Sequence, residues 1–105
     1  MAARTCDHPS CDRVSVVEVF SALGDPTRLA IVRLLDAADN EVPWGEIDLP
    51  IAPSTLSHHL KVLRNAGVVF SRQEGTRCFV SLRRAEIEGR FPGLLDLAAD
   101  EVVAR

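Results

Sequence analysis

The segment from Pro53 to Asn65 constrains the fold of this chain more than any other. In a helix that turns by about 100° per residue, its leucines share one narrow face: Leu56, Leu60 and Leu63. The opposite side carries no acidic residue and consists of Ser54, His58, Lys61 and Asn65. A helix that enters the DNA major groove needs this arrangement, because small polar groups reach base edges and cations meet phosphates. Taken alone, the segment favours the simpler interpretation of an ordinary amphipathic surface helix. The sequence on either side shifts the preference to a helix that enters DNA.

The residues ahead of this segment predict two further helices. Asp25 can cap the free N–H groups of a helix, and Pro26 fits its first position, so we predict a helix over about residues 26–37. Its broad apolar face predicts a central, buried position. An earlier helix over about residues 13–23, with Gly24 after its end, is predicted from apolar residues at helical spacing: Val16, Val19, Phe20 and Leu23.

Residues 43–53 complete a helix-turn-helix pattern. Pro43 can start a short helix over about residues 43–48. The segment 48–53 contains two prolines and must turn. A short helix joined by a tight turn to a second helix with an exposed polar face is the pattern of helix-turn-helix proteins.

A β-hairpin is predicted directly behind the leucine-faced helix. Gly67 can end that helix, and residues 68–72 and 77–82 have the composition of strands joined by a turn that contains Gly75. The turn is flanked by two cations, Arg72 and Arg77. Behind a helix that reads DNA, such a hairpin is typical of a DNA-binding wing, which we favour over a packing hairpin with solvated arginines.

Charge is distributed unevenly along the chain. The formal net charge is −3, which taken alone argues against nucleic acid as a partner. Residues 51–84, however, hold six Lys and Arg against one Glu, while the rest of the chain holds six Arg against fourteen Asp and Glu. A basic segment inside an acidic body predicts a footprint for a polyanion, and the alternative is chance segregation of surface charge.

The 105 residues suffice for one domain with one modest core. We predict a mobile arm over residues 1–12 and a domain over residues 13–105 that is mostly α-helical with a small β-hairpin. A short helix over about residues 83–89 precedes a final helix from Leu94 that is apolar around much of its circumference. One small domain cannot bury this helix together with the valine-rich first helix, so we expect a homodimer through the terminal helices rather than a self-contained monomer. The residues expected at that interface are Val16, Val19, Phe20, Leu94, Leu95, Ala98 and Val102.

Three stretches resemble the ArsR/SmtB family of winged-helix repressors. Residues 22–35 (ALGDPTRLAIVRLL) resemble the family's signature helix, residues 56–69 (LSHHLKVLRNAGVV) resemble its recognition helix, and residues 75–77 (GTR) resemble its wing tip. The similarity covers about residues 14–104 in the right order. It implies a homodimer that binds an inverted-repeat operator in double-stranded DNA and represses transcription. Family members usually leave DNA when they bind a metal ion, when a thiol is modified or, occasionally, when a small molecule binds.

The chain departs from the family's pattern at both familiar metal sites. The family's thiolate site lies in or before the helix around residues 42–48, and that stretch contains no cysteine here. The family's other site uses Asp, His and Glu of the last helix, which here has no His and offers only Asp96, Asp100 and Glu101. Ala52 stands where Ser or Thr commonly caps the recognition helix, so either Pro53 starts the helix without a side-chain cap or Ser54 is itself the cap.

The DNA contacts expected from this arrangement are Ser54, Thr55, Ser57, His58, Lys61, Arg64, Arg72 and Arg77. The hydroxyl and imidazole groups would lie near bases without dictating one base. The cations would meet phosphates or, for the wing arginines, the minor groove. Adjacent residues on a helix point about 100° apart, so His58 and His59 cannot readily share a metal ion, and we expect His59 at the edge of the core.

Cys6 and Cys11 form the one constellation that could sense an effector. Two thiols on a mobile arm, with His8 between them, could bind a thiophilic metal or metalloid ion, with Cys78 or the partner subunit completing the site, or could oxidise to a disulfide. Two ordinary surface thiols are an equally good interpretation. Cys78 alone is expected to be a small apolar strand residue, and no cofactor is expected to be required for folding.

These patterns favour one class of function over two others. The favoured class is a homodimeric DNA-binding regulator, either a repressor released by a metal, a metalloid or thiol modification, or one with a small-molecule inducer or no direct inducer. An enzyme is disfavoured because the chain offers no phosphate-binding glycine loop and no credible nucleophile–base pair. A thiol-based metal-binding or redox protein that uses the winged fold for protein contacts is disfavoured by the lack of acidic residues on the polar helix face. No apolar run approaches a membrane span and the N-terminus lacks the apolar core of a secretion signal, so we expect a cytoplasmic protein.

Overall fold

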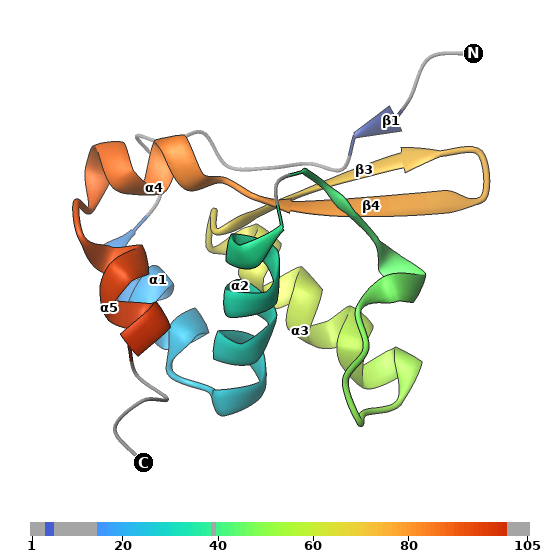
Figure 1. The fold of residues 1–105 in the computed structure, drawn as a ribbon, viewed down its shortest axis with the longest axis horizontal. Helices are drawn as coiled ribbons and strands as arrows, with labels where there is room; N and C mark the ends of the chain where they lie inside the picture. Colours follow the sequence, from blue (N-terminus) through green and yellow to red (C-terminus); the bar gives the residue numbers. More distant parts are fainter. Residues whose placement is uncertain (1–3, 6–14, 39, 101–105) are drawn as a thin grey trace.

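The computed structural model describes residues 4–5, 15–38 and 40–100 of the chain (Figure 1). Within these residues, the helices are α1 (Val16–Leu23), α2 (Pro26–Ala37), α3 (Pro53–Asn65), α4 (Arg84–Arg90) and α5 (Leu94–Asp100), and η2 (Trp44–Glu46) is a short 3-10 helix. The strands are β1 (Arg4–Thr5), β2 (Val42–Pro43), β3 (Val69–Glu74) and β4 (Arg77–Leu82). The fold is mostly helical with a small antiparallel hairpin after α3, which confirms the predicted winged helix-turn-helix.

Capping chemistry sets the start of the two helices in the centre of the chain. Both α2 and α3 begin and end at the predicted residues. Asp25 caps α2, because its Oδ1 accepts hydrogen bonds from the backbone N–H groups of Thr27 at 2.8 Å and Arg28 at 3.1 Å. α3 has no side-chain cap: Ala52 occupies the N-cap position and Pro53 the first helical position. The first of the two alternatives considered for this helix start is therefore the correct one.

Two further helix ends follow local signals. Within the described residues, α1 is capped by Ser15, whose Oγ accepts a hydrogen bond from the backbone N–H of Val17 at 3.1 Å. The predicted start at residue 13 lies outside the described residues. Gly67 follows α3 with φ of 82°, a left-handed conformation that favours glycine, and its N–H donates to the Arg64 carbonyl at 3.0 Å.

The prediction of a short helix over residues 43–48 is wrong in the extent and type of that helix. Val42 and Pro43 instead form β2, which pairs with β4 through Val42 opposite Val80 and Pro43 opposite Phe79. Helical structure is limited to the single 3-10 turn of η2. The fixed φ of proline suits an edge strand as well as a helix start, and pairing with β4 decides between the two.

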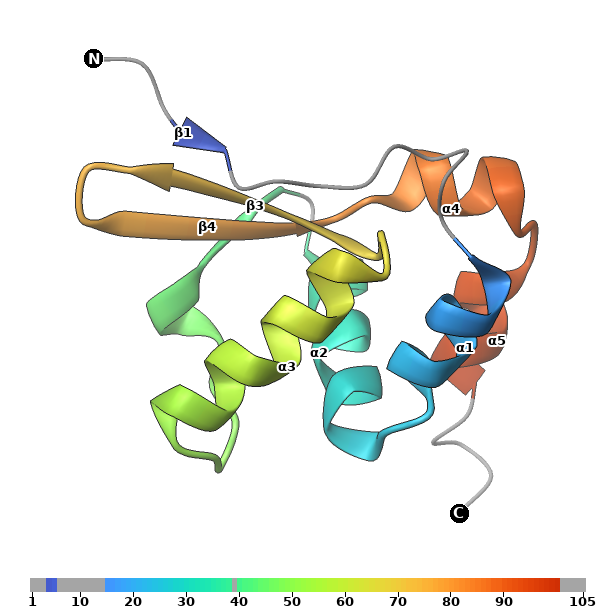
Figure 2. The same ribbon diagram turned by 180° about the vertical axis from the view of Figure 1, so that it is seen from behind.

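The four strands form one antiparallel sheet in the order β1-β3-β4-β2. The β3–β4 hairpin extends well beyond the helices (Figures 1 and 2). β1 adds to its outer edge, with Arg4 opposite Gln73 and Thr5 opposite Arg72. The arm predicted over residues 1–12 therefore contributes two residues to the sheet, and the rest of that arm lies outside the described residues.

The core lies between α2, α3 and the sheet, with α1 and α5 closing it. Figures 1 and 2 show α2 in the middle of the helical layer, which is the central position predicted for it. The largest fully buried side chains are Val19, Ile31, Val32, Leu35, Leu63, Val68, Val69 and Val80. Among the helices that the structure describes, none combines the length and apolar character needed to cross a membrane.

The residues predicted for a dimer interface differ widely in exposure. Three are at most 7% exposed and are buried within the protomer, so they are not available as a surface: Val19, Leu95 and Ala98. Leu94 is half-buried and Val102 lies outside the described residues. The exposed apolar residues of these helices are Val16 at 42%, Val17 at 72%, Phe20 at 59% and Leu97 at 70%. Packing fixes the rotation of each helix about its own axis, and this rotation decides which of its apolar residues are buried and which are exposed.

Candidate nucleic-acid interface

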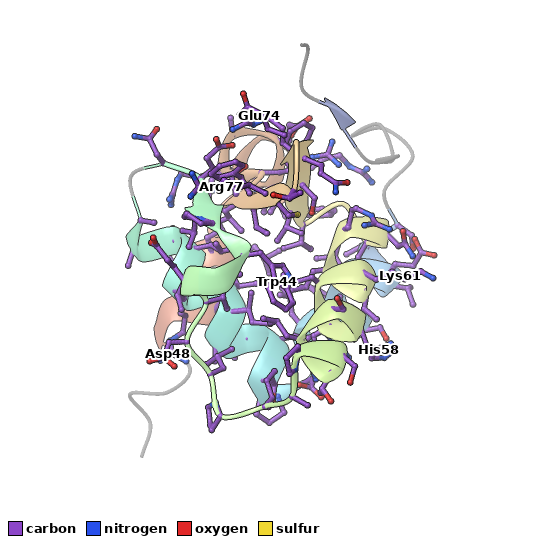
Figure 3. The ribbon with its side chains drawn as sticks, turned by 90° about the vertical axis from the view of Figure 1, so that its right-hand side faces the viewer. Trp44, Asp48, His58, Lys61, Glu74 and Arg77 are labelled. Carbon is purple, nitrogen blue, oxygen red and sulfur yellow. The ribbon has the colours of Figure 1, made fainter. Side chains whose placement is uncertain are left out.

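α3 presents one apolar face to the protein and one polar face to solvent. The leucines at positions 56, 60 and 63 are buried in the core. The exposed side chains of the other face include Ser54, Thr55, Ser57, His58, Lys61 and Asn65. Figure 3 shows His58 and Lys61 on the outer side of α3, pointing away from the other helices. No acidic residue lies on α3, so this face offers donors, acceptors and a cation without a carboxylate that would repel phosphate.

Arg28 of α2 contacts His59 on the side of α3 that faces the protein. Arg28 Nη1 lies 3.1 Å from His59 Nδ1, and Arg28 Nε donates to the Ala22 carbonyl at 2.7 Å. Because a guanidinium can only donate, His59 Nδ1 is the acceptor in this contact. His59 is half-buried at the edge of the core, where it was expected. Arg28 thus links α1, α2 and α3 at one point behind the polar face.

The two histidines of α3 point in different directions, as their adjacent positions on a helix require. The ring centroids of His58 and His59 are 5.7 Å apart and their planes are inclined by 57°. Within the described ranges, no group of three His, Cys, Asp or Glu side chains could hold a metal ion. Cys78 on β4 is half-buried and forms no disulfide with a described residue. Cys6 and Cys11 lie outside the described residues, so a thiol site on the arm stays a prediction.

The tip of the wing consists of a tight turn between Glu74 and Arg77 (Figure 3). Gly75 has φ of 61°, a conformation that other residues rarely adopt. Arg77 is exposed, and its guanidinium carbon lies 5.0 Å from the centre of the Phe79 ring. A cation stacked in this way is held in place while its outer side faces solvent.

Arg72, which the sequence analysis expected to contact DNA, is bound to partners within the protein. Its guanidinium binds the carboxylate of Glu41 through Nη2 and through Nε, the latter at 3.1 Å, and donates to Glu74 at 2.9 Å. It also stacks on Phe79, with 4.6 Å between the guanidinium carbon and the ring centre. The hydrogen bonds to Glu41 and Glu74 raise the pKa of Arg72, and the bond from Arg72 lowers the pKa of Glu41. Arg72 is therefore committed to partners within the protein.

Ion pairs within the protein reduce the number of cations in residues 51–84 that could meet a polyanion. Arg83 is buried and binds Glu86, with Nε 2.8 Å from a carboxylate oxygen. Arg84 pairs with Asp36 of α2. Together with Arg72, these arginines account for half of the cations in residues 51–84. The other three form no ion pair with any residue that the structure describes: Lys61, Arg64 and Arg77. All three lie on α3 or the wing tip.

The fold and this surface define a winged helix-turn-helix protein, and comparisons with known proteins agree. A family model described as a helix-turn-helix domain matches residues 23–71. The regulator YceK of Bacillus subtilis is 37% identical over 81 residues, which cover 75% of this chain and 81% of YceK. The transcriptional repressor SdpR of the same bacterium is 31% identical over 80 residues, covering 74% of this chain and 87% of SdpR. The transcriptional activator HlyU of Vibrio cholerae is 35% identical over 74 residues, covering 69% and 67%.

These similarities show that the chain belongs to the ArsR/SmtB family of helix-turn-helix transcriptional regulators. The relatives are transcriptional regulators and not enzymes, as the sequence indicated. The resemblance that the residues suggested is thereby confirmed.

Two residues of the interface region were missed by the sequence analysis. Phe79 had a usable signal, since alternation along β4 places it on the same face as Arg77 and opposite to Val80. Glu41 had none, because it meets Arg72 from 31 residues earlier in the chain. A contact at that separation depends on the strand order of the sheet.

Proposed function

We propose that this regulator is a homodimer that binds double-stranded DNA through the polar face of α3 and the wing tip, and represses transcription at an inverted-repeat operator. The observation that carries the proposal is the exposed, acid-free face of α3 beside a wing whose tip bears Arg77. A surface made for protein contacts would have no need to exclude carboxylates in this way.

The side chains on α3 divide by chemistry. Ser54, Thr55, Ser57 and His58 lie in its first turns and carry short groups that can donate to or accept from several base edges. Lys61 and Arg64 lie further along, where we assign them to phosphates. Arg77 approaches DNA from the wing and contacts phosphate or the minor groove. Because none of these groups dictates a single base, we expect modest direct readout with a large electrostatic contribution.

The exposed apolar residues of α1 and α5 support the dimer. Phe20 and Leu97 line a shallow groove with Leu23, Leu29, Leu94 and Ala98. A two-fold axis through this groove would bury these side chains against their copies and present two α3 helices to successive major grooves. Phe20→Asp should then give a monomer by sedimentation velocity and weaken binding to an inverted repeat. Ala85→Asp adds the same charge at an exposed position on α4 and should leave the dimer intact; a dimeric Phe20→Asp variant would contradict this assignment.

The direction of regulation and its trigger are part of the proposal. Repression follows the activity in the name of SdpR, although HlyU is named an activator. For the trigger, we propose that Cys6 and Cys11 bind a thiophilic ion or oxidise, and the alternative is that both are ordinary surface thiols. Operator binding by the reduced protein should be repeated with arsenite, zinc, cadmium and peroxide, and again with both cysteines changed to Ser. Release that persists in the Ser variant would end the thiol assignment, and release by none of these agents would favour a small molecule or partner.

The experiment that tests DNA binding directly uses mixed genomic fragments at two salt concentrations. We expect binding that weakens steeply as salt rises, because neutralised phosphates release counterions. Absent or salt-insensitive binding would instead favour a thiol-based protein that uses the winged fold for protein contacts.

A further inference from the structure

From the contacts around the wing, we infer that Arg72 is a positioning residue, joined to Glu41 in a clamp that holds the wing and Arg77 at a defined angle to α3. This inference rests on the proposed DNA-binding function. It replaces the direct DNA contact that the sequence suggested for Arg72. The clamp consists of Glu41, Arg72 and Phe79, and Arg77 is the residue that it holds.

Strand order makes the contact between Glu41 and Arg72 a bridge across the sheet. β4 lies between β3, which carries Arg72, and β2, which directly follows Glu41. Phe79 on β4 is paired with Arg72 on one side and with Pro43 on the other. The ion pair therefore spans β4 at the position of Phe79 and ties the outer strand of the hairpin to the connection between α2 and β2.

Phe79 connects the ion pair to the wing tip, because its ring contacts both Arg72 and Arg77. The guanidinium carbon of Arg72 lies 4.6 Å from its ring centre and that of Arg77 lies 5.0 Å from it. Both arginines thus stack on one ring, which itself lies under the ion pair. Arg77 is exposed and forms no ion pair with a described carboxylate, so its stacking on Phe79 is the contact that orients it.

The surroundings of Arg72 oppose a direct contact with DNA. Its side chain is only 25% exposed, and its guanidinium already serves two carboxylates. A phosphate that displaced Glu41 would lie beside two negative charges, and the two hydrogen bonds to that carboxylate would be lost. A role in positioning keeps every one of these contacts.

Two matched variants separate positioning from simple electrostatics. Glu41→Gln and Glu74→Gln each remove one negative charge and one carboxylate partner of Arg72, but only Glu41 lies outside the hairpin. If the carboxylates act only by repelling DNA, both variants should bind DNA more tightly than wild type. The clamp predicts instead that Glu41→Gln binds about threefold more weakly, the size of effect expected from losing one partly exposed ion pair, while Glu74→Gln is no weaker than wild type.

Arg72→Gln provides a second readout, the slope of log affinity against log salt concentration. Loss of a phosphate contact lowers that slope by about one. If Arg72 is a positioning residue, its loss should weaken binding at an unchanged slope, because Arg77 keeps its charge and still meets phosphate from a less favourable position. Titration at DNA concentrations far above Kd gives the binding-competent fraction of each variant, so partial unfolding is not mistaken for weaker binding.

The outcomes distinguish this inference from the proposed function on which it rests. Wild-type protein that shows no salt-sensitive DNA binding would refute the function. If wild-type binding depends steeply on salt, three results would each overturn the clamp alone. They are a Glu41→Gln variant that binds as tightly as wild type, a Glu74→Gln variant that is impaired as much as Glu41→Gln, and a lower salt slope for Arg72→Gln.

Discussion

Asp25 caps the central helix, and its replacement tests how that helix is held. Asp25→Ala removes an acceptor that two backbone N–H groups share, those of Thr27 at 2.8 Å and Arg28 at 3.1 Å. Loss of such a cap costs about 1 kcal/mol, and loss of a negative charge at a helix N-terminus about 0.5 kcal/mol more. We therefore expect the free energy of unfolding to fall by about 1.5 kcal/mol, which lowers Tm by about 6–12 °C in a domain of this size.

Asp25→Asn separates the cap from the charge. Asparagine caps a helix about as well as aspartate, so this variant should keep most of the stability at pH 7. Hydrogen bonding from the Arg28 N–H, helped by the Thr27 N–H and by the charge of Arg28, lowers the pKa of Asp25 below its ordinary 3.8. A carboxyl with a lowered folded-state pKa contributes stability that is present above 3.8 and is lost as pH falls through the folded-state value. The advantage of wild type over Asp25→Asn should therefore disappear in that acid range.

Urea unfolding followed by the fluorescence of Trp44, which packs against the core and is the only tryptophan of the chain, measures these differences. Protein concentration must be held constant, because the proposed dimerisation would make apparent stability depend on it. Asp48→Ala is the matched control, since Asp48 is exposed and caps no helix. An Asp25→Ala variant within about 0.5 kcal/mol of wild type, the range of ordinary surface substitutions, would refute the reasoning.

Three further substitutions have defined expectations. Ala52→Ser supplies the cap that α3 lacks and should stabilise the protein by about 0.5–1 kcal/mol in the same urea assay; no gain would mean that the serine does not reach the N–H groups. Gly75→Ala should cost about 1 kcal/mol through the backbone alone, because φ is 61° while the added Cβ meets nothing within 4 Å. Asparagine adopts a positive φ more readily than alanine, so a Gly75→Asn variant that loses as much stability as Gly75→Ala would contradict this origin. Leu63→Ala, at a position that is fully buried, should cost about 2–5 kcal/mol and broaden or abolish the unfolding transition, whereas a loss below about 1 kcal/mol would contradict its place in the core.

The parts of the fold that the sequence predicted well have local causes. α2 is set by Asp25 and Pro26, and α3 ends where Gly67 supplies a positive φ. The hairpin turn depends on Gly75. Each of these signals lies within a few residues of the structure it determines, so no tertiary information is needed to interpret it.

The parts that were mispredicted depend on contacts between distant segments. Pro43 pairs with Phe79 and belongs to β2, so only one 3-10 turn forms where a short helix was expected. Arg72 is neutralised by Glu41, and the count of basic residues therefore overstated the charge available to DNA. Helical periodicity placed Val19 at the dimer surface, but packing against the other helices rotates it into the core and leaves Val17 exposed.

The most direct test of the central claim, that α3 and the wing tip bind DNA, is the salt dependence of DNA affinity in single-cation variants. Lys61→Ala and Arg77→Ala should each weaken binding and lower the slope of log affinity against log salt concentration by about one. Arg90→Ala removes the same charge from α4, which lies at the opposite end of the molecule from the wing tip (Figure 1), and should leave the slope unchanged. Equal slopes in wild type and all three variants would contradict the account.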